Sequence, residues 1–348
     1  MSKGNIRVGV TIGDFNGVGM EVIIKTFLDV RILENITPIV YGSAQIASFY
    51  RKELEINDFG FNKISNTSEA RENKVNLIHL WEEQIVVEMG KSTEIAGRYA
   101  FKSLEAATED LAAGKIDVLV TAPINKKNIQ SDKFDFPGHT EYLTNYSNAD
   151  DSLMLMVLND LRVGTITNHV PLKDVSEVLT KELICRKIEI LQSSLQKDFG
   201  IKKPKIAVLG LNPHAGEDGM LGAEEKEVIF PAIEAMQEKG VIVYGPYPSD
   251  GFFGSSSFKN FDGILATYHD QGLTPFKTLV AGSGVNFTAG LPIVRTSPDH
   301  GTGYDITGKG IASEESFRNA IFTAVDIYNT RKNYQEINAN PLTAQKRR

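Results

Sequence analysis

Three strand-like runs organise this sequence: VGTIT (163–167), KIAVLG (205–210) and GILAT (263–267). Each run is followed by a short polar loop that carries a histidine, which is His169 in the first loop, His214 in the second and His269 in the third. In an open α/β sheet, ligands and catalytic groups collect beyond the carboxyl ends of the strands. We therefore expect the three histidines to lie at such strand ends.

Three imidazoles from separate strands would supply the protein ligands of a catalytic zinc-like site, which keeps one further position open. Most single histidines are instead hydrogen-bonded structural residues, and we interpret His79, inside the apolar run LIHL, in that way. The chain contains no H-E-x-x-H motif, so a zinc peptidase loses its usual support. The pattern by itself leaves both interpretations of the three histidines open.

Two aspartates accompany these histidines in the sequence. Asp270 directly follows His269, and Asp250 lies in the loop YPSDGFF after another strand-like run. Either carboxylate could orient an imidazole or accept a proton beside a metal ion. A solvated loop aspartate is the other interpretation of Asp250.

Strand-like and helix-like segments alternate along almost the whole chain. The strand candidates are 6–13, 37–42, 75–80, 117–123, 152–158, 161–167, 205–211, 241–246 and 262–267. Several are continuous apolar runs, which is typical of parallel strands buried on both faces. Helical periodicity marks 94–112 and 181–197. The strands that meet at Asn159-Asp160 predict an antiparallel hairpin, so we expect a mixed sheet.

The composition is that of an ordinary globular protein long enough for two domains, with 348 residues, 41% hydrophobic and 23% charged. A net charge of −7 argues against a nucleic-acid-binding surface. The single cysteine, Cys185, excludes an intramolecular disulfide and is expected to be a buried, inert thiol. We find no signal peptide and no apolar run of membrane-spanning length, so we expect a cytoplasmic protein without membrane partners.

Several polar segments are candidates for binding an anion. His139 and Thr140 stand at an expected helix start in FPGHTEYL, where free N–H groups favour phosphate or carboxylate, although a plain capped helix would look the same. Lys277, Asn286 and Arg295 flank the glycine-rich stretch AGSGVNFTAG and could form an anion clamp. The loop GDFNGVGME does not match G-x-G-x-x-G, which disfavours a Rossmann dinucleotide site.

Six motifs, taken in order along the chain, resemble those of one enzyme family. They are GDFNGVGME (13–21), PGHTE (137–141), NHVPL (168–172), LNPHAGEDG (211–219), YHDQG (268–272) and SPDHGTGYDITGKG (297–310). Together they make the chain similar to the 4-hydroxythreonine-4-phosphate dehydrogenases, which are NAD-dependent enzymes of pyridoxal 5′-phosphate biosynthesis.

The resemblance implies one divalent metal ion per active site, zinc, magnesium or cobalt, bound by His169, His214 and His269. It assigns a phosphorylated amino-acid substrate to a larger set of residues: His139, Thr140, Lys277, Asn286 and Arg295. It places the adenosine of NAD (or NADP) at the loop that contains His300, Gly301, Asp305 and Ile306. It also implies a homodimer with active sites at the subunit interface and metal ligands from both chains.

The resemblance further implies an α/β fold similar to that of isocitrate and isopropylmalate dehydrogenases, with two lobes around a mixed sheet and no Rossmann domain. We expect residues 1–125 and 275–330 to form the NAD-binding lobe. Residues 126–274 are then the metal-binding and dimerisation lobe. Periodicity is lost near the carboxyl end, and we expect 331–348 to be a flexible tail.

The implied reaction is oxidation of 4-phosphooxy-L-threonine (4-hydroxy-L-threonine phosphate) at C3, with decarboxylation to 3-amino-2-oxopropyl phosphate. The metal would polarise the C3 hydroxyl, hydride would pass to NAD, and Asp250 or Asp270 would take the hydroxyl proton. A related dehydrogenase acting on 4-phosphothreonate or 4-phosphoerythronate stays open, as does, more remotely, a cis-dihydrodiol dehydrogenase. From other classes, a three-histidine metal hydrolase and a non-catalytic phosphate-binding protein stay open too.

The first loop departs from the pattern of the resembling family, which usually reads G-D-P-A-G-I-G-P-E. Phe15, Asn16 and Met20 stand where Pro, Ala and Pro are usual, and Gly303 stands where alanine is usual. The glycines and Asp14 are kept, so we expect the tight turn of this loop to persist.

Overall fold

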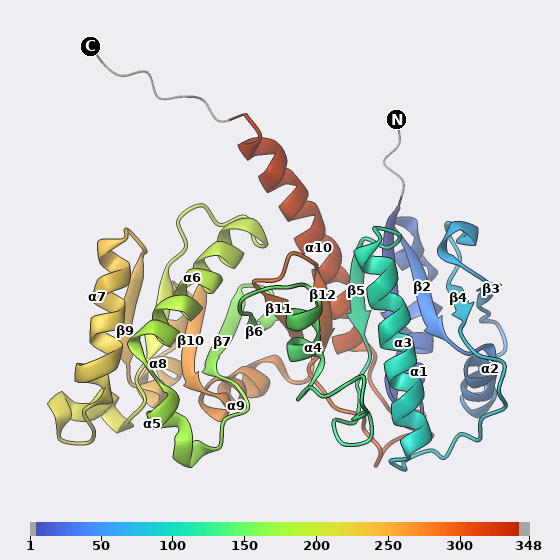
Figure 1. Ribbon diagram of the computed structural model, residues 1–348, viewed down its shortest axis with the longest axis horizontal. Helices are drawn as coiled ribbons and strands as arrows, with labels where there is room; N and C mark the ends of the chain where they lie inside the picture. The colour runs from blue at the N-terminus through green and yellow to red at the C-terminus, as the bar shows by residue number, and fades with distance from the viewer. Residues whose placement is uncertain (1–4, 341–348) are drawn as a thin grey trace. The chain divides into compact units, whose positions relative to one another are not determined.

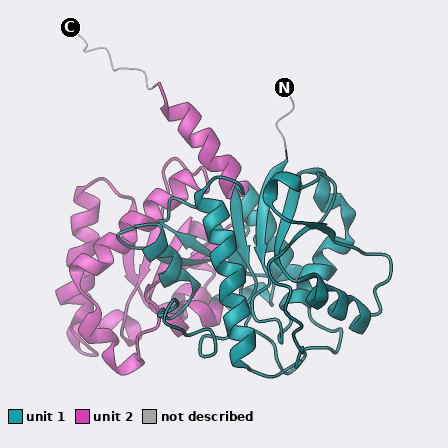
Figure 2. Ribbon diagram, turned by 45° about the vertical axis from the view of Figure 1, so that its right-hand side comes forward, with its two compact units in different colours: residues 1–159, 276–325 teal, residues 160–275, 326–348 magenta. Residues whose placement is uncertain are grey.

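The computed structural model describes residues 5–340, which form two compact units (Figure 2). Unit 1 consists of residues 5–159 and Phe276–Val325, and unit 2 consists of Asp160–Pro275 and residues 326–340. The chain passes from one unit to the other between Asn159 and Asp160, and again inside two helices, α9 (His269–Val280) and α10 (Glu315–Asn338).

Unit 1 extends beyond residue 125, where the predicted first lobe ended. It also includes helix α4 (His139–Tyr146) and strand β6 (Leu153–Leu158), because β6 pairs antiparallel with β11 (Val285–Ala289) of the same unit. The paired strands lie far apart along the chain, so the local pattern of residues 126–159 could not reveal this connection.

The sheet of unit 1 is mixed, as the sequence predicted. Its strand order is β3-β4-β2-β1-β5-β12-β11-β6 (Figure 1). Neighbours from β3 to β12 are parallel, whereas β11 runs antiparallel to both β12 and β6. The bounds not yet given are β1 (Ile6–Thr11), β2 (Ile36–Gly42), β3 (Asn62–Ile64), β4 (Asn76–His79), β5 (Val118–Thr121) and β12 (Arg295–Pro298).

The longest helix confined to unit 1 is α3 (Glu94–Ala112), which has the bounds that its periodicity predicted. It begins where the hydroxyl of Thr93 accepts a hydrogen bond from the amide of Ala96 at 3.2 Å. It ends before Gly114, whose positive φ of 67° is unfavourable for residues with a side chain. The helix packs on β1, β2 and β5, and the unit also contains the shorter helices α1 (Gly19–Leu28) and α2 (Ala44–Glu53).

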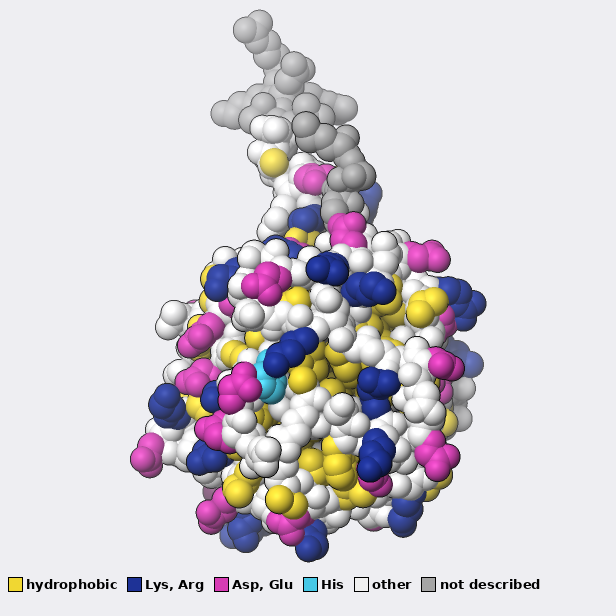
Figure 3. All heavy atoms as spheres, turned by 90° about the vertical axis from the view of Figure 1, so that its right-hand side faces the viewer, with side chains coloured by type: hydrophobic (Ala, Val, Ile, Leu, Met, Phe, Trp, Pro, Cys, Tyr) yellow, Lys and Arg dark blue, Asp and Glu magenta, His cyan; other side chains and the backbone are white. Residues whose placement is uncertain are grey.

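A buried apolar cluster joins α3 to the sheet of unit 1. It includes Ile39 and Tyr41 on β2, Leu119 on β5, and Leu104 and Ala107 on the helix. Burying a large apolar side chain contributes about 1.5–3 kcal/mol, so this cluster is a main source of the stability of the unit. Outside the core, acidic and basic side chains are interspersed on the face that Figure 3 shows, around recessed apolar side chains.

Unit 2 contains a parallel sheet in the order β7-β10-β8-β9. Its strands are β7 (Leu161–Thr167), β8 (Ile206–Leu209), β9 (Val243–Tyr247) and β10 (Gly263–Tyr268). Helix α6 (Lys181–Lys197) has the predicted bounds and packs on β7 and β10. The other helices of the unit are α5 (Val175–Val178), α7 (Phe230–Glu238) and α8 (Ser249–Gly254).

Every segment predicted as a strand contains one, but β3, β11 and β12 were not recognised in the sequence. Strands β11 (VNFTA) and β12 (RTSP) are short and carry Asn286 and Arg295 among small and hydroxyl side chains. Polar residues interrupt the apolar pattern by which a buried strand is recognised. The two strands are largely buried nonetheless, and the charge of Arg295 is accommodated by the hydroxyls of Thr121 and Thr288.

Helix α10 continues through residues 331–338, part of the segment for which a flexible tail was predicted. Arg331 on this helix forms an ion pair with the buried Asp198 at 2.5 Å, which anchors this part of the helix within unit 2. Residues 341–348 of the predicted tail lie outside the described residues. None of the helices within residues 5–340 has both the length and the apolar character needed to cross a bilayer.

Replacing Gly97 with alanine should destabilise unit 1. A Cβ atom at this position of α3 would overlap the backbone carbonyl of Asn128, so the helix or the loop must move. Comparable overpacking costs about 1–3 kcal/mol, which the free energy of unfolding from denaturant titration would measure. Gly254→Ala is the matched control, since Gly254 also lies in a helix but has no atom near the added methyl group. Wild-type stability in Gly97→Ala would contradict the close approach of α3 to the backbone of Asn128.

Candidate functional site

The three histidines follow strands of unit 2 whose carboxyl ends lie at the same edge of its sheet. Strand β10 pairs in parallel with both β7 and β8, with Tyr268 opposite Thr167. His269 directly follows β10, His169 lies just beyond β7, and His214 lies in the loop after β8. The predicted placement of the histidines at strand ends is thereby confirmed.

Two of the three imidazoles lie near each other. The ring centroids of His169 and His269 are 6.0 Å apart. The Nδ1 atom of His269 lies 2.6 Å from a carboxylate oxygen of Asp270, which leaves Nε2 available to a ligand. Metal-binding histidines commonly hold a carboxylate at the second ring nitrogen in this way. These two imidazoles are donors of the kind that a divalent metal ion accepts, and the carboxylate of Asp270 lies at the second ring nitrogen of one of them.

His214 lies apart from this pair, in an exposed turn with positive φ angles. Within residues 5–340, no group of three or more His, Cys, Asp or Glu side chains lies close enough together to hold a metal ion. A single chain thus brings two of the predicted ligands together and places the third elsewhere. The predicted sharing of ligands between two subunits stays a prediction.

A buried glutamine, Gln271, braces this sheet edge and was missed in the sequence. Its Oε1 accepts hydrogen bonds from the backbone amide and the hydroxyl of Thr267 at 2.8 and 2.9 Å. Its Nε2 donates to the carbonyl of Gly210 at 2.6 Å. Gln271 therefore links the end of β10, where His269 begins, to the loop after β8 that carries His214. Its position two residues after His269, in the motif YHDQG, was the signal in the sequence by which Gln271 could have been found.

The second candidate proton acceptor, Asp250, lies elsewhere along the chain of unit 2. It stands in the first turn of the short helix α8 with an exposed side chain. The structure thus brings Asp270, and not Asp250, into contact with one of the candidate metal ligands. The choice of proton acceptor stays open.

The predicted anion clamp lies in unit 1 and centres on Arg295, which is 2% exposed at the start of β12. Its Nε and Nη2 atoms donate to the hydroxyl of Thr121 at 3.0 and 2.6 Å, and its Nη1 donates to the hydroxyl of Thr288 at 3.2 Å. Burial lowers the pKa of Arg295 to about 9, so the guanidinium still carries its charge at neutral pH. A buried charge held by neutral hydroxyls is well suited to an anionic ligand.

Two neutral groups of the predicted clamp have buried atoms without a partner. These are Nε2 of His139 and Oδ1 of Asn286. Burial lowers the pKa of His139 well below its usual value, and the charges of Arg295 and Lys126 lower it further. The strand register places Asn286 opposite Ser297, on the sheet face that Arg295 also occupies. Unsatisfied buried polar atoms are costly, so these two atoms are available to a bound water molecule or ligand.

The two other predicted substrate residues are differently placed. Thr140 lies in the first turn of α4, and its backbone carbonyl accepts from the hydroxyl of Thr144 at 2.7 Å. Lys277 is exposed near the carboxyl end of α9, and its Nζ donates to the carbonyl of Asp299 at 2.6 Å. The structure therefore groups His139 and Arg295, whereas the ammonium of Lys277 is bound to the backbone that follows β12.

The candidate cofactor loop packs against the glycine loop at the start of the chain. The amide of Val18 donates to the carbonyl of Thr302 at 2.8 Å, and a Cβ at Gly17 would meet that same oxygen at 2.5 Å. The hydroxyl of Tyr304 donates to the buried Asp14 at 2.6 Å, and Asn128 donates to the same carboxylate oxygen at 2.7 Å. These contacts combine two distant motifs into one structure.

The four predicted cofactor residues lie on the outer part of this loop. Gly301 and Asp305 are exposed, and the amide of Ile306 donates to the carbonyl of Gly303 at 3.1 Å. The Nδ1 atom of His300 lies 2.9 Å from the carbonyl of Gly301, while its Nε2 is buried without a partner. The loop is therefore well ordered by its own hydrogen bonds and retains a buried imidazole nitrogen that a ligand could satisfy.

Two of the unusual residues in the first loop have a structural role. Asn16 accepts from the amide of Glu88 at 2.8 Å and donates to the carbonyl of Lys91 at 3.0 Å. Phe15 is fully buried, and its carbonyl accepts from the hydroxyl of Tyr50 at 2.7 Å. Asn16 ties residues 88–91 to the loop, which an alanine could not do. The tight turn persists, as predicted.

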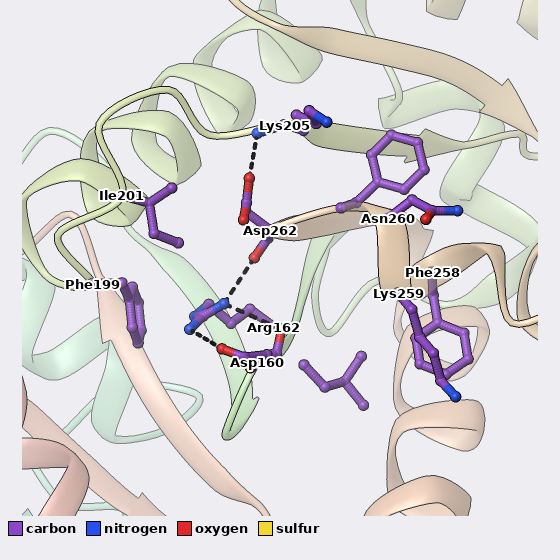
Figure 4. A pocket seen from close by; sticks show the side chains of 11 residues that line it. Asp160, Arg162, Phe199, Ile201, Lys205, Phe258, Lys259, Asn260 and Asp262 are labelled. Atoms are coloured by element: carbon purple, nitrogen blue, oxygen red, sulfur yellow. Dashed lines mark hydrogen bonds and ion pairs between the residues drawn. The ribbon is translucent and has the colours of Figure 1, made fainter.

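One pocket of about 720 Å³ lies at the opposite edge of the unit 2 sheet, at the amino ends of β7, β8 and β10 (Figure 4). Arg162 in this pocket donates to the carbonyls of Asp160 and Asp262, each at 3.2 Å, and lies over the ring of Phe199. The amide of Lys205 donates to the carboxylate of Asp262 at 2.7 Å. The lining groups thus largely satisfy one another, and the pocket does not coincide with the histidines.

Comparison with known proteins agrees with these motifs. The family model of the pyridoxal phosphate biosynthetic protein PdxA matches residues 34–324. A 4-hydroxythreonine-4-phosphate dehydrogenase of Bacteroides thetaiotaomicron is 51% identical over 346 residues, which cover 99% of this chain and 95% of the relative. A D-threonate 4-phosphate dehydrogenase of Cupriavidus necator is 38% identical, over 90% of this chain and 95% of the relative.

A solved structure has the same architecture over nearly its whole length. The crystal structure of the 4-hydroxythreonine-4-phosphate dehydrogenase of Klebsiella pneumoniae is 35% identical and has a TM-score of 0.80, over 94% of this chain and 99% of that chain. Family match, sequence identity and shared architecture lead to the same assignment. The chain belongs to the PdxA family of pyridoxal phosphate biosynthetic proteins.

Proposed function

We propose that this protein is a dehydrogenase that oxidises 4-phosphooxy-L-threonine at C3 with NAD, followed by decarboxylation to 3-amino-2-oxopropyl phosphate. The observation that carries the proposal is the buried Arg295, held by the hydroxyls of Thr121 and Thr288 beside the unpartnered Nε2 of His139. This arrangement provides a charge and free polar atoms for a phosphate. The 51% identical relative carries the name of this activity.

The clamp would hold the substrate through its phosphate group, away from the reacting carbon. The charged guanidinium of Arg295 attracts the phosphate, and the neutral imidazole of His139 can donate or accept one hydrogen bond to it. Asn286 presents a carbonyl oxygen on the same sheet face, which suits a donor group of the substrate. Binding energy from such a remote group orients the reacting carbon.

The histidines of unit 2 would hold one divalent metal ion, zinc, magnesium or cobalt, with His214 contributed by a second subunit of a homodimer. Such an ion supplies Lewis acidity that lowers the pKa of a substrate hydroxyl. Asp270 accepts a hydrogen bond from Nδ1 of His269 and so directs Nε2 toward the ligand. The carboxylate also stabilises any positive charge that develops on the imidazole.

NAD or NADP would bind at the loop that contains His300, Gly301, Asp305 and Ile306. The buried Nε2 of His300 and the exposed backbone at Gly301 are the groups that face a ligand in this proposal. The absence of a G-x-G-x-x-G motif supports a fold of the isocitrate and isopropylmalate dehydrogenase type in place of a Rossmann fold. A cytoplasmic enzyme is the setting we infer for this chemistry.

A second candidate function is oxidation of D-threonate 4-phosphate, because a relative with that name is 38% identical over 90% of this chain. Both substrates carry the phosphate that the clamp recognises. On the carbon next to the carboxylate, 4-phosphooxy-L-threonine has an amine and D-threonate 4-phosphate has a hydroxyl. A clamp that binds only the phosphate does not distinguish between these two substrates.

Turnover with defined substrates tests the proposal. The purified chain, with NAD and a divalent metal ion, should form NADH from 4-phosphooxy-L-threonine and show a lower kcat/KM with D-threonate 4-phosphate. Unphosphorylated 4-hydroxy-L-threonine is the control for the clamp and should be a poor substrate. A preference for D-threonate 4-phosphate would select the second candidate, and no NADH from either phosphate would refute a dehydrogenase.

Arg295→Lys should raise the KM for the phosphorylated substrate by at least about tenfold. Lysine carries a compact charge and lacks the planar fork that donates to Thr121, Thr288 and a phosphate together. Arg162→Lys is the matched control, because Arg162 is also buried but lines the pocket of unit 2, and the KM of this variant should stay at the wild-type value. Steady-state kinetics would measure both, and an unchanged KM in Arg295→Lys would argue against the clamp.

The stability of the protein should fall below pH 6.5 in part because of His139. Its folded-state pKa lies well below its usual value of 6.5, so between these two pKa values only the unfolded chain binds this proton. The contribution of the neutral His139 to the free energy of unfolding is complete above pH 6.5. It is lost as the pH falls, by up to about 1.4 kcal/mol per pH unit.

His139→Gln should therefore flatten the decline in melting temperature below pH 6.5. Above that pH, where His139 is neutral in both states, the two proteins should show parallel pH profiles. Identical slopes below pH 6.5 would show that the buried histidine does not control acid stability.

A further inference from the structure

The loop that carries His214 has an unusual backbone. Residues 214–218 all have positive φ, with values of 53°, 51°, 82°, 42° and 55°. Only one of the five, Gly216, lacks the Cβ that makes this left-handed region unfavourable. A run of left-handed residues persists only where neighbouring groups hold it, and such strain gathers at functional sites.

Two carboxylates hold the start of this turn. That of Glu224 accepts from the side-chain amide of Asn212 at 2.7 Å. The other belongs to Glu225, which is 3% exposed at the start of the π-helical turn Glu225–Ile229. Its Oε1 accepts from the backbone amide of Asn212 at 2.7 Å, and its Oε2 accepts from the side-chain amide of Asn212 at 2.9 Å. The carbonyl of Asn212 in turn accepts from the amide of Ala215 at 3.1 Å, inside the turn. Glu225 thus anchors the residue from which the turn starts.

Two glycines lie close to this carboxylate. A Cβ at Gly216 would lie 2.6 Å from Oε2 of Glu225, and a Cβ at Gly210 would lie 3.1 Å from Oε1. The same Gly210 carbonyl accepts from Gln271, which stands two residues after His269. The buried carboxylate, the turn with His214 and the strand end with His269 therefore form one connected structure.

We propose that Glu225 is a positioning residue that holds the left-handed turn so that the imidazole of His214 is presented for metal binding. The inference rests on the proposed function, in which His214 is a metal ligand. Glu225 acts through Asn212 and does not touch the metal, substrate or cofactor. A side chain at Gly216 would collide with this carboxylate, whose Oε2 lies 2.6 Å from the position of the added Cβ.

The test compares the zinc affinity of full-length variants, measured by competition with a chromogenic chelator. Glu225→Gln keeps the shape of the side chain but replaces one acceptor oxygen by an amide that cannot accept from Asn212. Loss of a residue that orients a metal ligand typically weakens metal binding by about 10–100-fold. We expect a loss in that range for Glu225→Gln and for Gly216→Ala.

The matched control is Gly219→Ala. Gly219 lies just after the turn and also has a positive φ, of 97°, but has no atom within 4 Å of an added Cβ. Its zinc affinity should stay within about twofold of wild type, since no group that orients a ligand is displaced. Hydrogen exchange of residues 212–220 in zinc-free protein provides a second readout. It should be faster in Glu225→Gln and Gly216→Ala than in Gly219→Ala.

Kinetics separate positioning from general damage to the fold. Saturating zinc should restore most of the kcat of Glu225→Gln while the KM for the phosphorylated substrate stays unchanged, because the clamp lies in the other unit. A variant that is merely destabilised would lose apparent kcat in proportion to its unfolded fraction, while the zinc affinity of its folded fraction would stay at the wild-type value. If Glu225→Gln fails to fold, Gly216→Ala against Gly219→Ala decides the matter alone.

His214→Ala distinguishes the failure of this inference from the failure of the proposed function. Wild-type zinc affinity in His214→Ala would remove His214 from the metal site and so refute that part of the proposed function. Weak binding in His214→Ala, with wild-type affinity and exchange in Glu225→Gln and Gly216→Ala, would overturn the positioning role alone.

Discussion

The parallel pairing of β10 with β7 and β8 is the constraint on which the candidate metal site depends. Parallel strands end at a common edge, so residues that follow them are brought together however far apart they stand in the sequence. Gln271 secures this edge by bonding to Thr267 and Gly210 at once. The pairing brings His169 and His269 near each other and leaves His214 on its own turn.

A second constraint is the burial of a positive charge in unit 1. Arg295 is enclosed among hydroxyl groups, and the same desolvation that lowers its pKa lowers that of His139. At pH 7 the guanidinium of Arg295 keeps its proton and its charge, whereas the imidazole of His139 is neutral. A phosphate would therefore meet one fixed charge and one adaptable hydrogen-bonding group, which gives both attraction and orientation.

Much of the fold was predictable because local patterns of apolar and polar residues determine where its helices and strands form. Helix α3 is marked by its helical periodicity and the stop at Gly114, and its bounds are as predicted. Strands β11 and β12 were missed, because Asn286 and Arg295 interrupt any apolar pattern and are accommodated only once the sheet has formed. The long helix α10 was partly mistaken for a tail, since the ion pair of Arg331 that anchors it is a long-range contact.

The sequence by itself determined the alternation of strands and helices, the strand-end positions of the three histidines and, through its motifs, the family. These properties depend on residue type and spacing, which are local. The tertiary structure alone decided that Arg295 is held by the hydroxyl of Thr121, that Lys277 bonds to a backbone carbonyl, and that Glu225 supports a left-handed turn. Each depends on where distant segments meet, and on the burial that results, which no local pattern records.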